Sequence, residues 1–432
     1  MTDVLVLGAG LVARPLVRYL LEDEKRSVTV ASRTVEKAEA LIQGHPKGAS
    51  VAFDIEDGKG LKELVSGHSM VVSMLPYIHH ASVARAAVDE GKDMVTTSYA
   101  NPAIRALDAE ARDRGVTLLN EMGLDPGIDH MEAMRVIDSI KAVGGKVDGF
   151  ISYCGGLPAP EANTNPWGYK FSWSPRGVVL ASRNSARFRM DGNTVEVPGR
   201  DLFANYELID IEGLGTFEGY PNRDSVPYAD IYGIGDAGTI LRGTLRNRGW
   251  CDTLKAVHDI GLLEEAPPEC RTYAGLLGSL VPGRGPLRAR IAERIRTKDN
   301  DRALSNMEWL GLLSRKRLRD TSTRLDALCA LLQEKLRYSR NERDMVILKH
   351  IFHATLPEGK RTFTSTLIDF GIPGGDSSMS RTVGLPAGIG AEMVLSGKLR
   401  HLPGVQIPVR KEIYGPALLK LSDKGIRFQH SS

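Results

Sequence analysis

A chain of 432 residues exceeds one ordinary hydrophobic core, so two or three domains are expected, and its 42% apolar content is enough to bury them. Its 56 Lys and Arg against 53 Asp and Glu leave a net charge of +3, which excludes recruitment of nucleic acid or a membrane surface by bulk charge. The 4 cysteines form no CxxC pair, and no run reaches the roughly 18 apolar residues of a membrane-spanning helix or resembles a secretory leader. We therefore expect a cytoplasmic protein with no metal site, disulfide framework, nucleic-acid partner or membrane partner.

Residues 3 to about 120 alternate short apolar runs with helical stretches. The runs that we expect to be strands are VLVLG, SVTVAS, ASVAFDI, SMVVSML, DMVTTSY and GVTLLNE. Continuous apolar strands separated by helices predict an α/β domain with a doubly wound parallel sheet. The turn residues Asp125, Pro126 and Gly127 precede a helix expected from about Ile128, so we place the boundary there and assign residues 1–125 to the first domain.

A second sheet and a helical segment follow. KVDGFISYCGGLPAP predicts a strand, and SARFRMDGNTVEVPG predicts a hairpin built on Asp191 and Gly192. LRARIAERIRTK, NMEWLGLLSRKRL and TRLDALCALLQEKLRY have helical spacing, and two further strand-like runs flank PEGK before the helical GLPAGIGAEMVLSGKL. We predict a second α/β domain with a mixed sheet over 126–251 and 343–394, a helical insertion over 252–342, and a segment from about 395 to 432 that packs back on the first domain and frays at FQHSS.

A glycine turn follows the first predicted strand. Gly8-x-Gly10-x-x-Ala13 stands between that strand and a helix, the context in which this Rossmann fingerprint binds a dinucleotide. Gly8 would make the tight turn, Gly10 would let the backbone approach the pyrophosphate, and Ala13 would permit close packing. The alternative is a structural turn without a ligand.

The end of the second predicted strand, VTVASRT, selects the cofactor. A carboxylate there binds the ribose diol of NAD, but this sequence has Ser32, Arg33 and Thr34. An arginine matches phosphate geometry, which favours NADP(H), although Arg33 as an ordinary surface charge remains the alternative. Asp54 either contacts the adenosine or caps a turn.

Polar residues follow the later strands, and ligands bind at the carboxyl ends of such sheets. Leu75 would border the nicotinamide, while Thr97, Ser98 and Tyr99 place hydroxyls at the tip of the fifth strand. Tyr99 packing on the next helix is an equal alternative. The neighbouring His79 and His80 are expected near solvent at a helix start, and His130 is expected to be structural.

The second domain must supply contacts to a substrate. Arg223, Arg242, Arg246 and Arg248 fall in what we interpret as loops, and converging arginines favour binding of carboxylates. Four surface arginines with no shared target are the alternative.

Several strings closely resemble the saccharopine dehydrogenase family of the NADP-dependent, glutamate-forming type, also called saccharopine reductases. They are TTSYANPA, NEMGLDPGIDH, SYCGGLPAPE, NPWGYKFSWS, YPNRDS, RGTLR and GLPAGIGAEMVL. The resemblance extends from residue 3 to about 250 and from about 303 to 400. It implies that 2-aminoadipate 6-semialdehyde is condensed with L-glutamate and the imine reduced to saccharopine, or the reverse, in lysine metabolism, and it implies a homodimer formed through the second sheet.

The resemblance also implies which residues bind. For NADP(H) it implies Gly8, Gly10, Leu11, Val12, Ser32, Arg33, Thr34, Asp54, Ile55, Leu75, Thr97, Ser98, Leu124, Asp125, Pro126 and Ser174. For saccharopine it implies Ser98, Tyr99, Asp125, Arg223, Thr244, Leu245 and Arg246. Tyr99, Asp125 and Cys154 are candidates for orientation or proton transfer, and none is assigned as an essential acid or base.

Two other functions compete with this interpretation. A related imine-reducing enzyme, such as a carboxynorspermidine dehydrogenase, would need acidic contacts to a diamine, whereas this sequence offers arginines. A non-catalytic, nucleotide-sensing Rossmann protein would have lost the strings of the second domain, which are intact.

Overall fold

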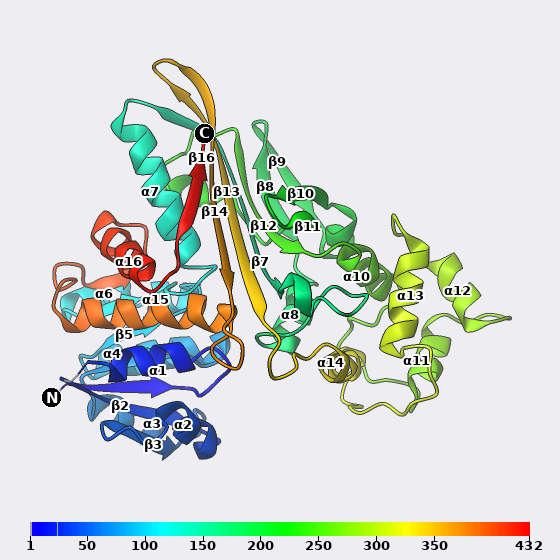
Figure 1. Ribbon diagram of the computed structural model, residues 1–432. Helices are drawn as coiled ribbons and strands as arrows, with labels where there is room; N and C mark the ends of the chain where they lie inside the picture. Colours follow the sequence, from blue (N-terminus) through cyan, green and yellow to red (C-terminus); the bar gives the residue numbers. More distant parts are fainter. Residues whose placement is uncertain (1, 24) are drawn as a thin grey trace. The chain divides into compact units, whose positions relative to one another are not determined.

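The computed structural model describes residues 2–23 and 25–432, and its contacts divide them into two compact units (Figure 1). The first unit runs to Gly144 and resumes over Gly375–Gln429. The second covers Gly145–Gly374 together with His430–Ser432. The segment Gly145–Gly374 is therefore inserted within the chain of the first unit, and residues His430–Ser432 belong again to the second unit.

The first unit contains a parallel sheet of seven strands in the order β15-β6-β5-β4-β1-β2-β3. Their bounds are β1 Thr2–Leu7, β2 Arg26–Ser32, β3 Gly48–Ala52, β4 Met70–Ser73, β5 Asp93–Thr96, β6 Thr117–Leu119 and β15 Gly404–Gln406. The side chains of Val4 through Leu7 are fully buried, as expected of a strand covered on both faces. The predicted doubly wound α/β class is confirmed.

Helices connect these strands and cover the sheet. They are α1 Arg14–Leu21, α2 Val35–Ile42, α3 Gly58–Ser66, η1 Tyr77–His79, α4 His80–Asp89, α5 Pro102–Arg105, α6 Asp108–Asp113, α7 Ile128–Ala142, α15 Ser378–Leu395 and α16 Lys411–Asp423. Helix α15 packs on α1, and α7 packs on α16. Both α7 and α15 thus belong to the first unit, so the contacts put the boundaries at residues 144 and 375 rather than near 125 and 394.

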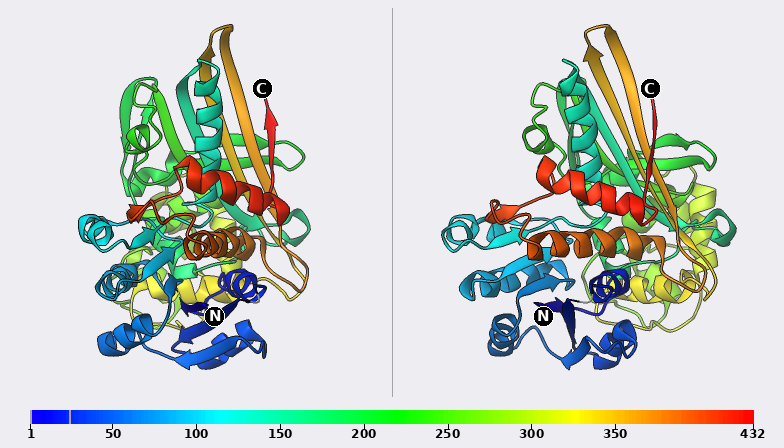
Figure 2. Two further views of the ribbon diagram at one scale, coloured as in Figure 1. Left: turned by 90° about the vertical axis from the view of Figure 1, so that its left-hand side faces the viewer. Right: turned by 60° about the vertical axis from the view of Figure 1, so that its left-hand side comes forward.

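The second unit contains a mixed sheet of nine strands. They are β7 Lys146–Pro158, β8 Ala186–Met190, β9 Asn193–Val197, β10 Glu207–Ile211, β11 Gly215–Pro221, β12 Thr239–Arg246, β13 Asp344–Leu356, β14 Gly359–Phe370 and β16 Phe428–Ser431. The long strands β7, β13 and β14 run side by side (Figure 2). The expectation that the last residues fray is wrong, because β16 lies beside β14 and the hydroxyls of Thr364 and Ser431 are 2.6 Å apart.

The helical segment of this unit has a core of its own. The helices of the second unit are η2 Pro160–Ala162, α8 Pro175–Ala181, η3 Gly199–Ala204, α9 Tyr228–Ile231, α10 Trp250–Asp259, α11 Tyr273–Leu280, α12 Leu287–Arg294, α13 Asn300–Leu310 and α14 Arg324–Lys335, and α10 to α14 form the helical segment. The expected single helix over NMEWLGLLSRKRL is wrong, because α13 ends before Gly311, whose φ of 101° is left-handed. Trp167 and Trp250 are both buried in this core, with their ring centroids 6.0 Å apart.

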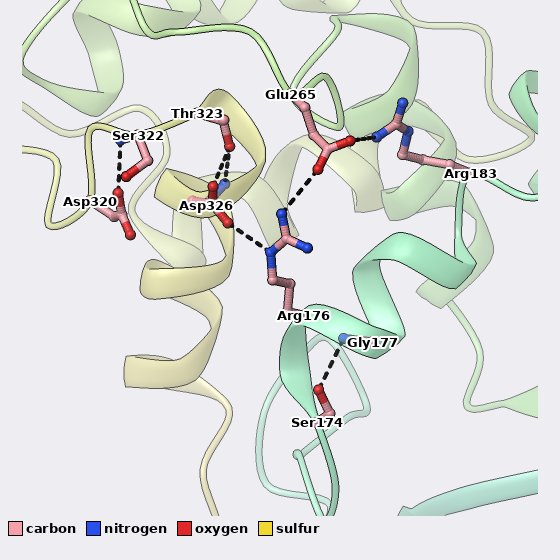
Figure 3. Close-up of polar contacts among 9 residues, drawn as sticks. All are labelled: Ser174, Arg176, Gly177, Arg183, Glu265, Asp320, Ser322, Thr323 and Asp326. Carbon is pink, nitrogen blue, oxygen red and sulfur yellow. Dashed lines mark hydrogen bonds and ion pairs between the residues drawn. The ribbon is translucent and has the colours of Figure 1, made fainter. Parts of the chain in front are cut away.

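An ion-pair network ties α8 to the helical segment. Arg176 donates to Asp326 on α14 and to Glu265, which also accepts a hydrogen bond from Arg183 (Figure 3). These side chains are about half exposed except Asp326, so each pair adds well under about 1 kcal/mol. Within the described part of the chain, no helix has the length and apolarity needed to cross a membrane.

Candidate functional site

The glycine turn lies between β1 and α1, and its two glycines differ in what the protein requires of them. Gly8 has a φ of 106°, and a Cβ there would lie 2.9 Å from the carbonyl oxygen of Met74. A Cβ at Gly10 would meet no atom within 4 Å. The fold itself therefore needs glycine at position 8, whereas the space above Gly10 is open to a ligand that approaches the backbone.

The N-terminus of α1 carries no compensating side chain. The N-cap residue Ala13 makes no side-chain hydrogen bond, and the first turn contains no acidic residue. Leu11, the residue after Gly10, exposes 69% of its surface. Amide groups and the positive end of the helix dipole are thus available to an anion at this turn, as a pyrophosphate requires.

The end of β2 presents cationic and hydroxyl groups. Arg33 is exposed, and residues 2–23 and 25–432 offer it no hydrogen bond or ion pair. The Ser32 hydroxyl accepts a hydrogen bond from the Thr34 amide at 3.3 Å. Together with the open turn at Gly10, this set fits NADP(H), because a free guanidinium and two hydroxyls match a 2′-phosphate.

Three further predicted cofactor residues follow β3 and β4. Asp54 accepts a hydrogen bond from the Glu56 amide at 3.1 Å, so it does cap a turn. Ile55 and Leu75 are partly buried against the core of the first unit. Their contact with a cofactor stays a prediction.

His80 departs from the expectation of a solvent-facing helix start. Its side chain is buried, and its ring nitrogens lie 2.9 Å from Ser73 Oγ and 2.8 Å from Ser98 Oγ. Burial lowers the pKa of His80 to about 4. His79 is partly exposed, with Nδ1 4.0 Å from Glu56. Sequence reasoning missed His80 because no local signal distinguishes it from His79.

The loops after β5 and β6 bring Tyr99 and Asp125 together. The Tyr99 hydroxyl donates to Asp125 Oδ1 at 3.2 Å, which favours an orienting role over simple packing on the next helix. Leu124 and Pro126 beside Asp125 are buried, while Thr97 and Ser98 are partly exposed.

A buried pair supports these loops. Glu121 has a φ of 62°, accepts a hydrogen bond from the Ala100 amide at 3.0 Å and lies 2.8 Å from His130 Nε2. His130 therefore connects α7 to the loop before it, in line with the structural role expected of it. Glu121 is a second supporting residue that the sequence did not reveal.

Cys154 and Thr244 are neighbours in the second unit. They are register partners in the parallel pairing of β7 with β12. Arg242, Thr244 and Arg246 alternate along β12, so their side chains share one face. The interpretation of Arg242 and Arg246 as loop residues is therefore wrong, since both lie in a strand and are buried.

Arg246 is a buried cation that has no carboxylate partner among residues 2–23 and 25–432. Its guanidinium stacks over the rings of Tyr169 and Trp250, at 5.0 and 5.5 Å from their centroids. Nη1 donates to the carbonyl oxygen of Leu245 at 2.7 Å, and buried Nε has no partner among the described residues.

Glu218 on β11 is the register partner of Arg246, yet its carboxylate is hydrogen-bonded to backbone amides rather than to the guanidinium. Its carboxylate accepts hydrogen bonds from the amides of Gly249 and Cys251, at 2.6 and 2.8 Å, at the start of α10. Burial raises the pKa of Glu218. A buried charge normally requires a counter-charge, so binding of an anionic group by Arg246 stays a prediction that its surroundings allow.

Arg223 and Ser174 are less clearly placed as binding residues. Arg223 is exposed, has a φ of 56° and accepts a hydrogen bond from the Arg187 amide at its carbonyl oxygen. The Ser174 hydroxyl accepts from the Gly177 amide at 3.2 Å and caps α8 (Figure 3). The described ranges contain no cluster of three or more His, Cys, Asp or Glu that could hold a metal ion.

Comparisons with known proteins agree with this geometry. Residues 4–119 match the saccharopine dehydrogenase NADP binding domain, and residues 123–426 match the saccharopine dehydrogenase C-terminal domain. The chain is 41% identical to the saccharopine dehydrogenase [NADP(+), L-glutamate-forming] of Schizosaccharomyces pombe, covering 99% of this chain and 98% of that protein.

Two further relatives are a longer protein that this chain matches in part and a solved structure that it matches throughout. The mitochondrial alpha-aminoadipic semialdehyde synthase of Mus musculus is 39% identical over 99% of this chain, which matches only 48% of that protein. The solved apo saccharopine dehydrogenase (L-Glu forming) of Saccharomyces cerevisiae superposes with a TM-score of 0.92 at 40% identity, covering 100% of this chain and 99% of that one. The chain belongs to the saccharopine dehydrogenase family.

Proposed function

We propose that this chain is an NADP(H)-dependent saccharopine dehydrogenase of the L-glutamate-forming type. It condenses 2-aminoadipate 6-semialdehyde with L-glutamate and reduces the imine to saccharopine, or runs the reverse reaction, in lysine metabolism. The observation that carries this proposal is the buried Arg246, which lacks a carboxylate partner within the described residues. Saccharopine has three carboxylates, so its binding requires focused positive charge in a protein whose net charge is only +3.

The first unit holds the cofactor. Amides at the turn of Gly10 and Leu11 bind the pyrophosphate, and Ser32, Arg33 and Thr34 bind the 2′-phosphate. When bound, NADP(H) supplies or accepts the hydride at the substrate carbon. The open space above Gly10 and the unpaired Arg33 support this assignment.

Other residues of the chain align the substrate. Arg246 and Arg223 bind carboxylates, with Thr244 and Leu245 beside Arg246 on β12. Asp125 holds the substrate amino group, and the hydroxyl of Tyr99 fixes the rotamer of Asp125 by donating to it. Cys154 contacts the substrate next to Thr244. Alignment of this kind lowers the barrier by ordering the reacting groups in advance.

The direct test is consumption of NADPH on mixing the enzyme with aminoadipate semialdehyde and glutamate. We expect loss of absorbance at the NADPH band only when both substrates are present, and reduction of NADP when saccharopine is supplied instead. Replacing glutamate by a diamine is the control for the carboxynorspermidine type of reaction. NADPH binding without turnover of any substrate would contradict the proposal and favour a nucleotide sensor.

We also propose a cytoplasmic homodimer. The dimer follows from the family resemblance, and β10, the edge strand next to β11 in the described sheet, exposes 54% of Leu208. The four cysteines form no disulfide with one another, which supports a reducing compartment. Light scattering after gel filtration and imaging of a fluorescent fusion test these two proposals.

A further inference from the structure

His80 is enclosed by three hydroxyl groups at the carboxyl ends of β4 and β5. Nδ1 lies 2.9 Å from Ser73 Oγ, and Nε2 lies 2.8 Å from Ser98 Oγ. Thr96 Oγ1 is 3.3 Å from each nitrogen and donates its proton to the carbonyl oxygen of Ser73 at 3.0 Å. The shorter contacts with Ser73 and Ser98 are therefore the hydrogen bonds that fix the orientation of the His80 ring.

The protonation pattern of the ring follows from the burial of Ser73. A neutral imidazole has one donor nitrogen and one acceptor nitrogen. Ser73 is 0% exposed, and His80 Nδ1 is the one hydrogen-bond partner of its hydroxyl in the described part of the chain. If Nδ1 carried the proton, the Ser73 hydroxyl hydrogen would be buried without an acceptor, which is unfavourable because the group has lost its water and gained no partner. Ser73 therefore donates to Nδ1, and the proton of His80 lies on Nε2.

This tautomer determines what Ser98 can offer. Nε2–H donates to Ser98 Oγ, so the hydroxyl of Ser98 accepts from the protein and keeps its own proton for another acceptor. Ser98 is partly exposed, and no second side-chain partner occupies its hydroxyl among residues 2–23 and 25–432. The Ser98 carbonyl oxygen is held separately, by the Glu121 amide at 3.1 Å.

We propose that His80 is a positioning residue that holds the Ser98 hydroxyl as a hydrogen-bond donor toward an acceptor oxygen of the bound ligand. The oxygen belongs either to a carboxylate of saccharopine or to the dinucleotide. The identity of the ligand rests on the proposed function, whereas the tautomer does not.

The tautomer is tested without activity. Protein labelled with ¹⁵N at histidine should show, at neutral pH, a His80 ring with protonated Nε2 and unprotonated Nδ1 in long-range ¹H–¹⁵N spectra. Loss of that resonance in His80→Gln assigns it. A protonated Nδ1 would overturn the proposal, and this measurement on the wild-type chain holds even where a variant fails to fold.

The positioning role is tested by two substitutions that differ in reach. The amide of His80→Gln extends to about the position of Nε2 and can donate to Ser98, whereas that of His80→Asn extends only to that of Nδ1. We expect His80→Asn to raise KM for one ligand about 10-fold with kcat within about 3-fold, and His80→Gln to restore KM. Ser98→Ala should cost less in His80→Asn than in the wild type, because His80 acts through the Ser98 hydroxyl and part of that effect is already lost.

The neighbouring His79→Gln is the matched control and should leave both KM values unchanged. A rise in KM for saccharopine identifies a substrate carboxylate as the acceptor, and a rise in KM for NADPH identifies the dinucleotide. Equal losses of kcat in His80→Asn and His80→Gln with unchanged KM values would overturn the proposal. Absence of saccharopine turnover in the wild type would contradict the proposed function alone, since Kd for NADPH and the ring tautomer remain measurable.

Discussion

Glu218 lies directly opposite Arg246 in the antiparallel pairing of β11 with β12, yet its carboxylate binds the amides of Gly249 and Cys251. The Glu218 carboxylate thus satisfies amide groups at the start of α10. The guanidinium of Arg246 stacks instead on the aromatic rings of Tyr169 and Trp250. Residues directly opposite each other on antiparallel strands are close enough to form an ion pair, so Glu218 and Arg246 could have paired. The absence of this pair leaves a buried cation in the sheet of the second unit.

Arg246→Met separates ligand binding from stability. We expect KM for saccharopine to rise about 10–100-fold, because a charge-assisted hydrogen bond contributes about 1.5–3 kcal/mol. The free energy of unfolding should change by less than about 1 kcal/mol, since no described carboxylate loses a partner. Steady-state kinetics and urea denaturation measure the two effects. Arg288→Met, which removes an exposed pair with Glu308, is the control, and an equal rise in KM there would contradict the role of Arg246.

Arg33→Ala tests the choice of cofactor. Loss of the guanidinium should weaken NADPH binding about 10–100-fold and NADH binding by less than about 3-fold, because only NADPH has the 2′-phosphate. Fluorescence titration gives both Kd values. The exposed Lys37→Ala on α2 controls for a general loss of positive charge. Equal losses for the two cofactors would refute the assignment.

Gly8→Ala and Gly10→Ala should affect different properties. Gly8→Ala should lower the free energy of unfolding by more than about 1 kcal/mol, because its φ is 106° and its Cβ would meet Met74. Gly10→Ala should leave stability within about 0.5 kcal/mol and weaken NADPH binding, since its Cβ enters open space. Thermal melts with and without NADPH measure both. A stable Gly8→Ala variant would show that the turn tolerates a side chain.

Tyr99→Phe distinguishes orientation from proton transfer. The Tyr99 hydroxyl donates to Asp125, so its removal should raise KM for saccharopine and reduce kcat by less than about 10-fold. Removal of an essential general acid or base would cost about 10²–10⁴ in rate. The pH profile of kcat/KM should keep both of its limbs; loss of one limb would assign Tyr99 to proton transfer.

His80 should make stability depend on pH in the acid range. Burial lowers its pKa from 6.5 to about 4, so the unfolded chain binds a proton at pH values where the folded chain does not. The contribution of His80 to the free energy of unfolding is therefore complete above pH 6.5. It decreases as the pH falls toward 4, by about 3 kcal/mol in total. The difference between wild type and His80→Gln in urea denaturation, measured from pH 7 to 4.5, isolates this effect. A difference that is independent of pH would contradict it.

The parallel sheet and the glycine turn could be predicted because their signals are local. Runs of β-branched residues such as VTVAS identify buried strands, and the order of strand, Gly8, Gly10 and helix identifies the turn. Gly311 is a local signal that the helical spacing obscured, since apolar residues continue beyond it while its left-handed backbone ends α13.

Burial of polar residues could not be predicted, because it depends on residues remote in sequence. RGTLR contains glycine and arginines and is typical of a loop, but Tyr169 and Trp250 enclose the guanidinium of Arg246 within a strand. His80 has the same local surroundings as His79, and only Ser73 and Ser98 distinguish it. Register and tertiary packing decided both cases.

The strand β15 has a consequence for synthesis of the chain. Gly404–Gln406 pairs with Thr117–Leu119, so β6 lacks one neighbour until residues 404–406 have been synthesised. The continuous segment Gly145–Gly374 is made in the interval and can fold as a body while the earlier sheet still has an open edge. An unpaired edge strand can pair with a strand of another chain. The β6 edge must therefore be shielded from other nascent chains until β15 has been made.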